Sequence, residues 1–163
     1  MDEGYEETKY SPELDDAWDL EFTQNGTAIV TEQEGGVKAF NITENDTNQL
    51  FEDHIEVTVD RNSGLMGIAI DPNYEENKRI YLQYSYRNES ASQDMELMNR
   101  ISSFRFDEKG LTNERILEEG IEINRHHTGG RLEIGPDGAL YATVGESNGP
   151  SKVARILRLN TET

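Results

Sequence analysis

The sequence contains no cysteine, few basic residues and no long apolar run. Without cysteine there can be no disulfide framework, no thiolate nucleophile and no cysteine-ligated zinc or iron–sulfur site. No stretch approaches the roughly 20 consecutive apolar residues of a membrane-spanning helix, so no membrane span is expected. The first ten residues are polar and acidic and do not resemble a secretion signal, so the chain as written is expected in the cytoplasm.

Acidic side chains dominate the charge. The 163 residues include 33 acidic and 15 basic side chains, which gives a formal net charge of −18. Such a charge repels phosphates and excludes nucleic acid as the natural partner. It also favours a salt-adapted, halophilic source over an ordinary acidic protein. At molar salt the Debye length falls to about 3 Å, so we expect folding to strengthen as salt screens the self-repulsion.

Three hairpin patterns recur along the chain, each with apolar–polar alternation on both sides of a turn. Their strand ends at Phe22, Ile70 and Ile134 repeat at intervals similar to the kelch-type blade of about 50 residues. The hairpins occupy residues 18–30, 67–84 and 131–144. Further strand patterns follow them at 37–42 and 55–59, at 100–106 and 115–117, and at 154–159.

This pattern predicts an all-β fold, a partial β-propeller in a single domain over residues 1–163. We expect about two and a half four-stranded antiparallel blades, whereas propellers close with roughly 4–8 blades. Either another chain completes the propeller, or the chain is a truncated piece with exposed strand edges. Trp18, Tyr81, Tyr84 and Tyr141 could form a sugar-stacking platform, but their strand positions favour packing within or between blades.

The third hairpin and the segment before it resemble the soluble quinoprotein glucose/sorbosone dehydrogenase family, which includes aldose sugar dehydrogenases. Two earlier stretches agree, at residues 17–32 and 64–72. The run that carries the resemblance most clearly is His126-His127-Thr128-Gly129-Gly130-Arg131-Leu132. Three matches in the family's order cover most of the chain, so the resemblance is more specific than one turn motif.

The resemblance implies a six-bladed propeller that binds pyrroloquinoline quinone (PQQ) and oxidises an aldose sugar at C1. His127 falls at the family's catalytic histidine, which takes the proton of the C1 hydroxyl while hydride passes to the quinone. An imidazole suits this role because it accepts protons near neutral pH. The neighbouring His126 is expected to contact the cofactor, and family members often act in the periplasm or outside the cell.

Each of these residues also has a simpler interpretation that needs no cofactor or substrate. Arg131 could bind a carboxylate of the tricarboxylic quinone, but an ion pair with local acids is the favoured interpretation. The histidine pair could be a polar loop cap or an adventitious metal site. Adjacent residues of a strand point to opposite faces, so His126 and His127 are not expected to share a metal.

Departures from the family argue that the chain is incomplete. Asn62 stands where the family usually has a cofactor-contacting glutamine or glutamate. The later blades, with the calcium ligands and the basic cofactor contacts, have no counterpart, so no metal ligand is assigned. We therefore predict PQQ-dependent aldose oxidation as the function, with this chain inactive or incomplete by itself. The alternative is a non-catalytic, propeller-like binding or interaction module.

Overall fold

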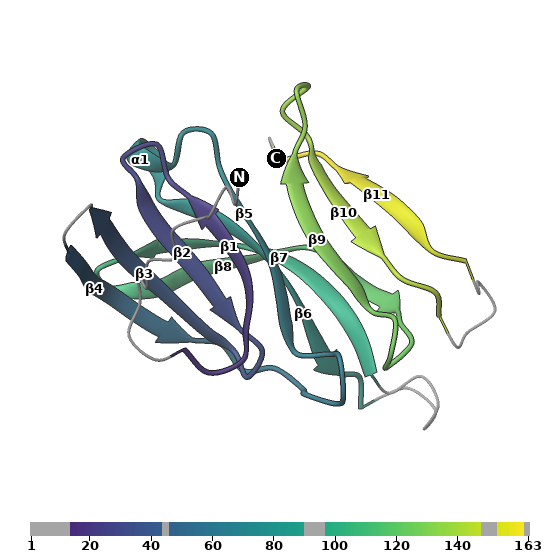
Figure 1. The fold of residues 1–163 in the computed structure, drawn as a ribbon. Helices are drawn as coiled ribbons and strands as arrows, with labels where there is room; N and C mark the ends of the chain where they lie inside the picture. The colour runs from purple at the N-terminus through teal and green to yellow at the C-terminus, as the bar shows by residue number, and fades with distance from the viewer. Residues whose placement is uncertain (1–13, 44–45, 90–96, 148–152, 162–163) are drawn as a thin grey trace, which may run out of the picture.

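Three antiparallel sheets lie side by side (Figure 1) in the computed structural model, which describes residues 14–43, 46–89, 97–147 and 153–161. The first sheet has the order β1-β2-β3-β4 and the second β5-β6-β7-β8, while the third has the order β11-β10-β9. We call them the first, middle and third blades, because they match blades of a propeller. The all-β prediction is confirmed.

Within each blade the strands follow one another in chain order. The first blade consists of β1 (Ala17–Phe22), β2 (Thr27–Glu32), β3 (Gly36–Thr43) and β4 (Asp46–His54). The middle blade consists of β5 (Leu65–Ile70), β6 (Arg79–Arg87), β7 (Leu97–Asp107) and β8 (Gly110–Glu122). The third blade consists of β9 (Gly129–Ile134), β10 (Leu140–Val144) and β11 (Arg155–Leu159).

A single-turn helix, α1 (Tyr74–Asn77), lies in the connection between β5 and β6, where the sequence predicts a turn. The described part of the chain contains no helix with the length and hydropathy to cross a bilayer.

The strand predicted at residues 55–59 is wrong. The outer strand of the first blade is β4, which pairs with β3, and residues 55–59 belong to the connection that leads to the middle blade. The apolar alternation of this connection has another cause, because Ile55 and Val57 pack against the core between the first two blades. β4 was missed because its sequence is mostly polar and its residues 48–50 are exposed.

Strands β1, β5 and β9 are the neighbouring inner strands, because β5 contacts both β1 and β9. Two side chains of the first blade meet the backbone of β5. The Thr31 hydroxyl donates to the carbonyl of Met66 at 2.7 Å, and the Asp19 carboxylate accepts from the amide of Ile68 at 3.2 Å. These bonds satisfy backbone groups that the middle sheet itself leaves unpaired.

Apolar side chains fill the two spaces between the blades. Residues such as Ile29, Leu65 and Leu82 occupy the first interface, and Tyr81, Ile101 and Leu132 occupy the second. The packing predicted for Tyr81 and Tyr84 is confirmed, since both are buried.

The packing predicted for Trp18 is not seen. Trp18 is 40% exposed and alternates with Asp19 along β1, as Leu20 and Phe22 do; we call the face that carries these three side chains the outward face of β1, although at the strand end Phe22 also borders Ile70 and Pro72 of the middle blade. Asp19, on the opposite face, contacts β5. No described residue covers this outward face closely enough to bury the three side chains.

Candidate functional site

Residues 123–128 form a loop, here called the histidine loop, between β8 and β9. Asn124 shapes it: its side-chain oxygen accepts from the amide of His126 at 2.9 Å, and its carbonyl accepts from the amide of His127 at 3.1 Å. The histidines therefore lie in a turn instead of the strand assumed from the sequence. Their ring centroids are 6.5 Å apart and the rings are inclined by 59°.

His127 is anchored by a carboxylate. Its Nδ1 lies 2.6 Å from Oε1 of Glu146, and both side chains reach solvent, with 65% and 49% exposure. A carboxylate at Nδ1 favours the tautomer with the proton on that nitrogen and leaves Nε2 as the acceptor. The pair can therefore take a proton from a hydroxyl placed at Nε2.

Glu146 was not identified from the sequence. It follows β10, which pairs with β9 so that Val144 lies opposite Gly129. Residues just before β9 and just after β10 therefore meet at one end of the third blade. The register of the β9–β10 hairpin would have predicted that Glu146 lies near His127. The motif that contains the histidines does not include this information.

Asn62 fastens the histidine loop to the middle blade. Its amide donates to the carbonyl of Arg125 at 3.2 Å, and its side-chain Nδ2 donates to the carbonyl of His126 at 3.0 Å. Its own carbonyl accepts from the Thr128 hydroxyl at 2.8 Å. An ion pair between Arg125 and Asp60 at 3.0 Å adds a further link. Through these bonds Asn62 fixes the backbone on which His126 and His127 lie.

Glycine lets the backbone pack closely around this loop. A Cβ atom at Gly145 would lie 1.6 Å from the carbonyl oxygen of His127, and one at Gly67 would lie 1.8 Å from the carbonyl of Gly130. Neither position has room for a side chain. Gly145 therefore lets the end of β10 approach the histidine loop, and Gly67 lets β5 of the middle blade approach β9.

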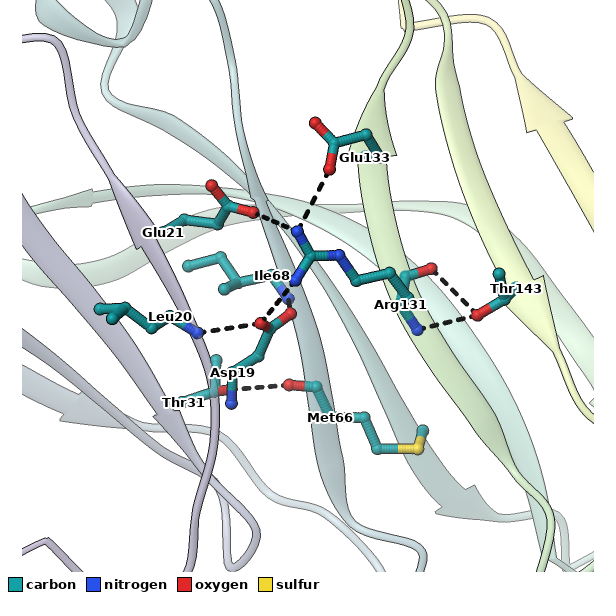
Figure 2. A network of polar contacts seen from close by, with 9 residues as sticks. All are labelled: Asp19, Leu20, Glu21, Thr31, Met66, Ile68, Arg131, Glu133 and Thr143. Carbon is teal, nitrogen blue, oxygen red and sulfur yellow. Dashed lines mark hydrogen bonds and ion pairs between the residues drawn. The ribbon is translucent and has the colours of Figure 1, made fainter. Parts of the chain in front are cut away.

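Arg131 lies farther along β9 and reaches across β5 to the first blade (Figure 2). Its guanidinium pairs with Asp19 at 3.0 Å, Glu21 at 3.1 Å and Glu133 at 3.2 Å. The ion pair favoured from the sequence is confirmed. Asp19 and Glu21 belong to β1, so Arg131 connects the two blades that flank the middle one.

The surroundings of Glu21 and Arg131 in this network shift the pKa values of both groups. Burial raises the pKa of Glu21, while the positive charge of Arg131 acts against that rise and the nearby carboxylates Glu133 and Asp19 add to it. The hydrogen bond to Glu133 and the charge of Asp19 raise the pKa of Arg131. The guanidinium of Arg131 therefore stays charged and bound to carboxylates of the protein.

The structure brings His126, His127 and Asn62 into one place and puts Arg131 in a separate network. The described residues contain no group of three or more histidine, aspartate or glutamate side chains arranged to hold a metal ion.

Comparison with known proteins agrees with the propeller geometry. The sequence profile of the glucose/sorbosone dehydrogenase family matches residues 14–160. The chain therefore belongs to this family. Quinoprotein glucose dehydrogenase B of Acinetobacter calcoaceticus is 33% identical over 91 residues, which are 53% of this chain and 19% of that protein. Human Hedgehog-interacting protein is 33% identical over 89 residues, 51% of this chain and 13% of that protein.

Solved structures show the same arrangement of blades. The PQQ-bound aldose sugar dehydrogenase of Streptomyces coelicolor superimposes with a TM-score of 0.73 and 26% identity, over 93% of this chain and 46% of that one. A glucose dehydrogenase structure with 18% identity and a TM-score of 0.78 supports the fold alone. The chain spans about half the length of these structures, and a fifth or less of the two curated relatives above.

Proposed function

We propose that the chain forms part of a PQQ-dependent dehydrogenase that oxidises an aldose sugar, with His127 as the general base. The observation that carries this proposal is the 2.6 Å contact between His127 Nδ1 and Glu146 Oε1. An imidazole held in this way presents Nε2 to a substrate. The family membership and the PQQ-bound structural relative support the reaction class.

His127 contributes by taking the proton of the sugar's C1 hydroxyl. Glu146 holds the ring and stabilises the imidazolium that forms when the proton arrives. Asn62 binds the carbonyls of Arg125 and His126 just before His127 and accepts from the Thr128 hydroxyl just after it, so the backbone that carries the ring is held on both sides. Position matters because general-base action needs a substrate already aligned with the base.

The described residues do not by themselves fit the tricarboxylic cofactor. The guanidinium of Arg125 pairs with Asp60, and that of Arg131 pairs with three carboxylates. An anionic group brought to either arginine would meet a guanidinium that carboxylates of the protein already neutralise. We therefore expect the cationic contacts to come from the remaining blades, while this chain supplies the base. His126 and Asn62 remain proposed neighbours of the cofactor.

Complementation tests the proposal. The chain alone, with quinone and calcium, is expected to oxidise glucose negligibly. When the remaining blades of a family member are supplied as a separate chain, activity should appear. His127→Ala should then lower the rate by about 10²–10⁴-fold, the usual contribution of general-base action. His126→Ala is the matched control and should have a smaller effect. Strong turnover by the chain alone, or activity indifferent to His127→Ala, would contradict the proposal.

A non-catalytic interaction module is the second candidate function. The outward face of β1 favours it, because Trp18, Leu20 and Phe22 are 40–55% exposed there. Contiguous apolar side chains on a surface often mark a site of protein association. The sequence also predicts, as one alternative, a chain that completes the propeller. We propose this face as the place where such a chain would pack. Analytical ultracentrifugation in high salt tests both, because a strict monomer would argue against association through this face.

A further inference from the structure

A cavity of about 230 Å³ lies over strands β6, β7 and β8 of the middle blade. Arg79 lines it from β6, Arg105 from β7 and Arg115 from β8, and we call it the arginine cavity. No aspartate or glutamate is among the described residues that line it, although acidic residues outnumber basic ones by 33 to 15 in the chain. A smaller cavity beside β1, β5 and β9, by contrast, is lined by three carboxylates. The arginine cavity therefore gathers basic side chains on an acidic protein.

The arginine cavity and the histidine loop lie at opposite ends of the middle blade. Asn62, which binds the histidine loop, lies before the start of β5. Arg79 begins β6, and the next residue, Ile80, pairs with Ile70 at the end of β5. The six residues of β5 extend over about 20 Å. The two sites are therefore distinct.

The register of the sheet brings the three arginines together. Arg79 lies directly opposite Arg105, and Arg115 lies opposite Ser103, two residues from Arg105. Directly opposed residues of antiparallel strands share one face, as do residues two apart on a strand. Like charges in such positions repel one another. An anion between the guanidiniums would offset this repulsion.

Arg105 is bound to the protein only in part. Its Nε and Nη2 both contact Asp107 at 2.7 Å, and its Nη1 donates to the carbonyl of Asn77 at 3.2 Å. A guanidinium has five N–H groups, so two of those of Arg105 have no partner in the described part of the chain. The side chain is 42% exposed, so these groups are accessible.

The other two arginines are also accessible. Arg79 is 43% exposed, and its Nη1 lies 3.6 Å from Asp71, which is longer than a hydrogen bond. The Tyr81 hydroxyl is a second neighbour of Arg79. Arg115 is exposed on β8. Arg131 differs from these residues, because three carboxylates surround its single guanidinium.

These features favour a small, doubly charged oxyanion as the ligand. Guanidiniums donate in forks that match the oxygens of phosphate, and three of them can each meet a different oxygen. The cavity is smaller than the roughly 300–1,000 Å³ typical of drug-sized ligands. The net charge of −18 opposes a long polyanion. A single small anion responds mainly to adjacent charges, because the Debye length is about 8 Å at physiological salt.

We propose that the arginine cavity binds a phosphate group, whose oxygens accept from Arg79, Arg105 and Arg115. The phosphate is either inorganic phosphate or the charged end of a small phosphate ester. This site does not depend on the proposed activity of His127.

Amide chemical shifts test this binding directly. The ¹⁵N-labelled chain is titrated with inorganic phosphate, glycerol 3-phosphate and acetate, at a constant ionic strength set with sodium chloride. We expect saturable shifts at the amides of residues 77–79, 103–105 and 113–115, with a Kd of about 1–10 mM for phosphate. Acetate, with one charge and two oxygens, should bind more weakly. Glycerol 3-phosphate that binds as tightly as phosphate or more tightly would identify an ester as the ligand, and weaker binding would identify free phosphate.

Substitutions distinguish the cavity from a general effect of charge. Arg79→Gln and Arg115→Gln should each weaken phosphate binding about tenfold or more, as expected for loss of a hydrogen bond between charged groups. Both side chains are accessible, so neither change removes core packing. Arg87→Gln is the matched control, because it removes the same charge at the far end of β6. It should bind phosphate as the parent chain does.

Several results would overturn the proposal. One is the absence of saturable shifts at these amides up to about 100 mM phosphate, far above the expected Kd. Others are binding that Arg79→Gln and Arg115→Gln leave unchanged, an equal loss in Arg87→Gln, and acetate binding as tight as that of phosphate. Shifts confined to residues 124–128 would also contradict this site, while leaving the proposed function of His127 intact.

Discussion

The two interfaces between blades are built differently. The first interface, between the first and middle blades, is dominated by large apolar side chains, including Leu65, Ile68 and Leu82, which have no exposed surface. The second interface has an apolar part around Leu132 and Leu140. Towards the histidine loop it becomes polar, with Gln83, Ser85 and Asn99 fully buried.

The polar part of the second interface supports the segments that carry the candidate site. The Ser85 hydroxyl donates to Asn99 at 2.9 Å and accepts from the amide of Gly64 at 3.1 Å, beside Asn62. Gln83 Nε2 lies 3.4 Å from the carbonyl of Thr143, near the end of β10. Apolar packing therefore holds the first two blades together, whereas the polar part of the second interface fixes Gly64 beside Asn62 through Ser85, and Gln83 adds only one long contact with the third blade.

Leu82→Ala in the first interface should have the largest effect on stability. Leu82 is fully buried, and truncation of such a leucine typically costs 2–5 kcal/mol, because apolar burial is lost and a cavity remains. Leu20→Ala is the matched control, since Leu20 is 45% exposed on the outward face of β1, and it should cost about 0.5 kcal/mol or less. Urea unfolding measures both, and equal losses would show that the first interface is not the main source of stability.

Asp71→Asn should have an intermediate effect that depends on pH. Asp71 is buried and accepts from the Asn73 amide and the Tyr81 hydroxyl, both at 2.9 Å, with Arg79 at 3.6 Å. Burial alone would raise its pKa, but these hydrogen bonds, a further one from Asn77 and the charge of Arg79 together lower it. The carboxylate therefore stabilises the fold above the ordinary aspartate pKa of 3.8, and this contribution is lost as the pH falls through the lower folded value.

At neutral pH we expect Asp71→Asn to cost about 1–3 kcal/mol, the range for disturbing a buried hydrogen-bonded group. Urea unfolding of the variant should also lose less stability than the parent between neutral pH and about pH 3, because one native-state carboxylate no longer titrates. Glu76→Gln, an exposed carboxylate in the same turn, is the control and should keep the parent's pH dependence. An identical acid response of the parent and Asp71→Asn would contradict this account.

Gln83→Met in the second interface should have the smallest effect. The Oε1 of Gln83 is buried and has no hydrogen-bond partner in the described part of the chain, and its Nε2 makes one long contact. Replacing an incompletely paired polar group with an apolar one of similar size can be nearly neutral. Thermal unfolding should therefore report a change below about 1 kcal/mol. A loss as large as that of Leu82→Ala would mean that Gln83 holds the blades together.

The sequence predicted most of the fold because alternation and turn residues are local signals. Gln24-Asn25-Gly26 lies in the turn between β1 and β2, within the hairpin predicted at residues 18–30. The outer strand β4 could not be predicted in the same way, since it pairs with only one strand and has little apolar character. Its place in the sheet depends on hydrogen bonds to β3, which alternation does not encode.

The candidate site was predictable only in part. The resemblance to the family put His127 forward as the base, which stays a prediction, and the abundance of acids favoured an ion pair for Arg131. The identity of the partners was not predictable, because Asp19 and Glu21 lie more than a hundred residues earlier in the chain. Glu146 reaches His127 only because β10 pairs with β9, so no short sequence pattern predicts it. The effect of salt on folding stays a prediction.

The central claim is that Glu146 holds His127 with its Nε2 ready to accept a proton. Ring ¹⁵N chemical shifts of the parent chain above the titration range of histidine measure this directly, because they report which nitrogen carries the proton. We predict the Nδ1–H tautomer for His127, and a shift towards a mixed population in Glu146→Gln. His126, without a carboxylate at its ring in the described structure, should be unaffected by that substitution. A His127 ring that is protonated at Nε2, or that does not respond to Glu146→Gln, would contradict the account.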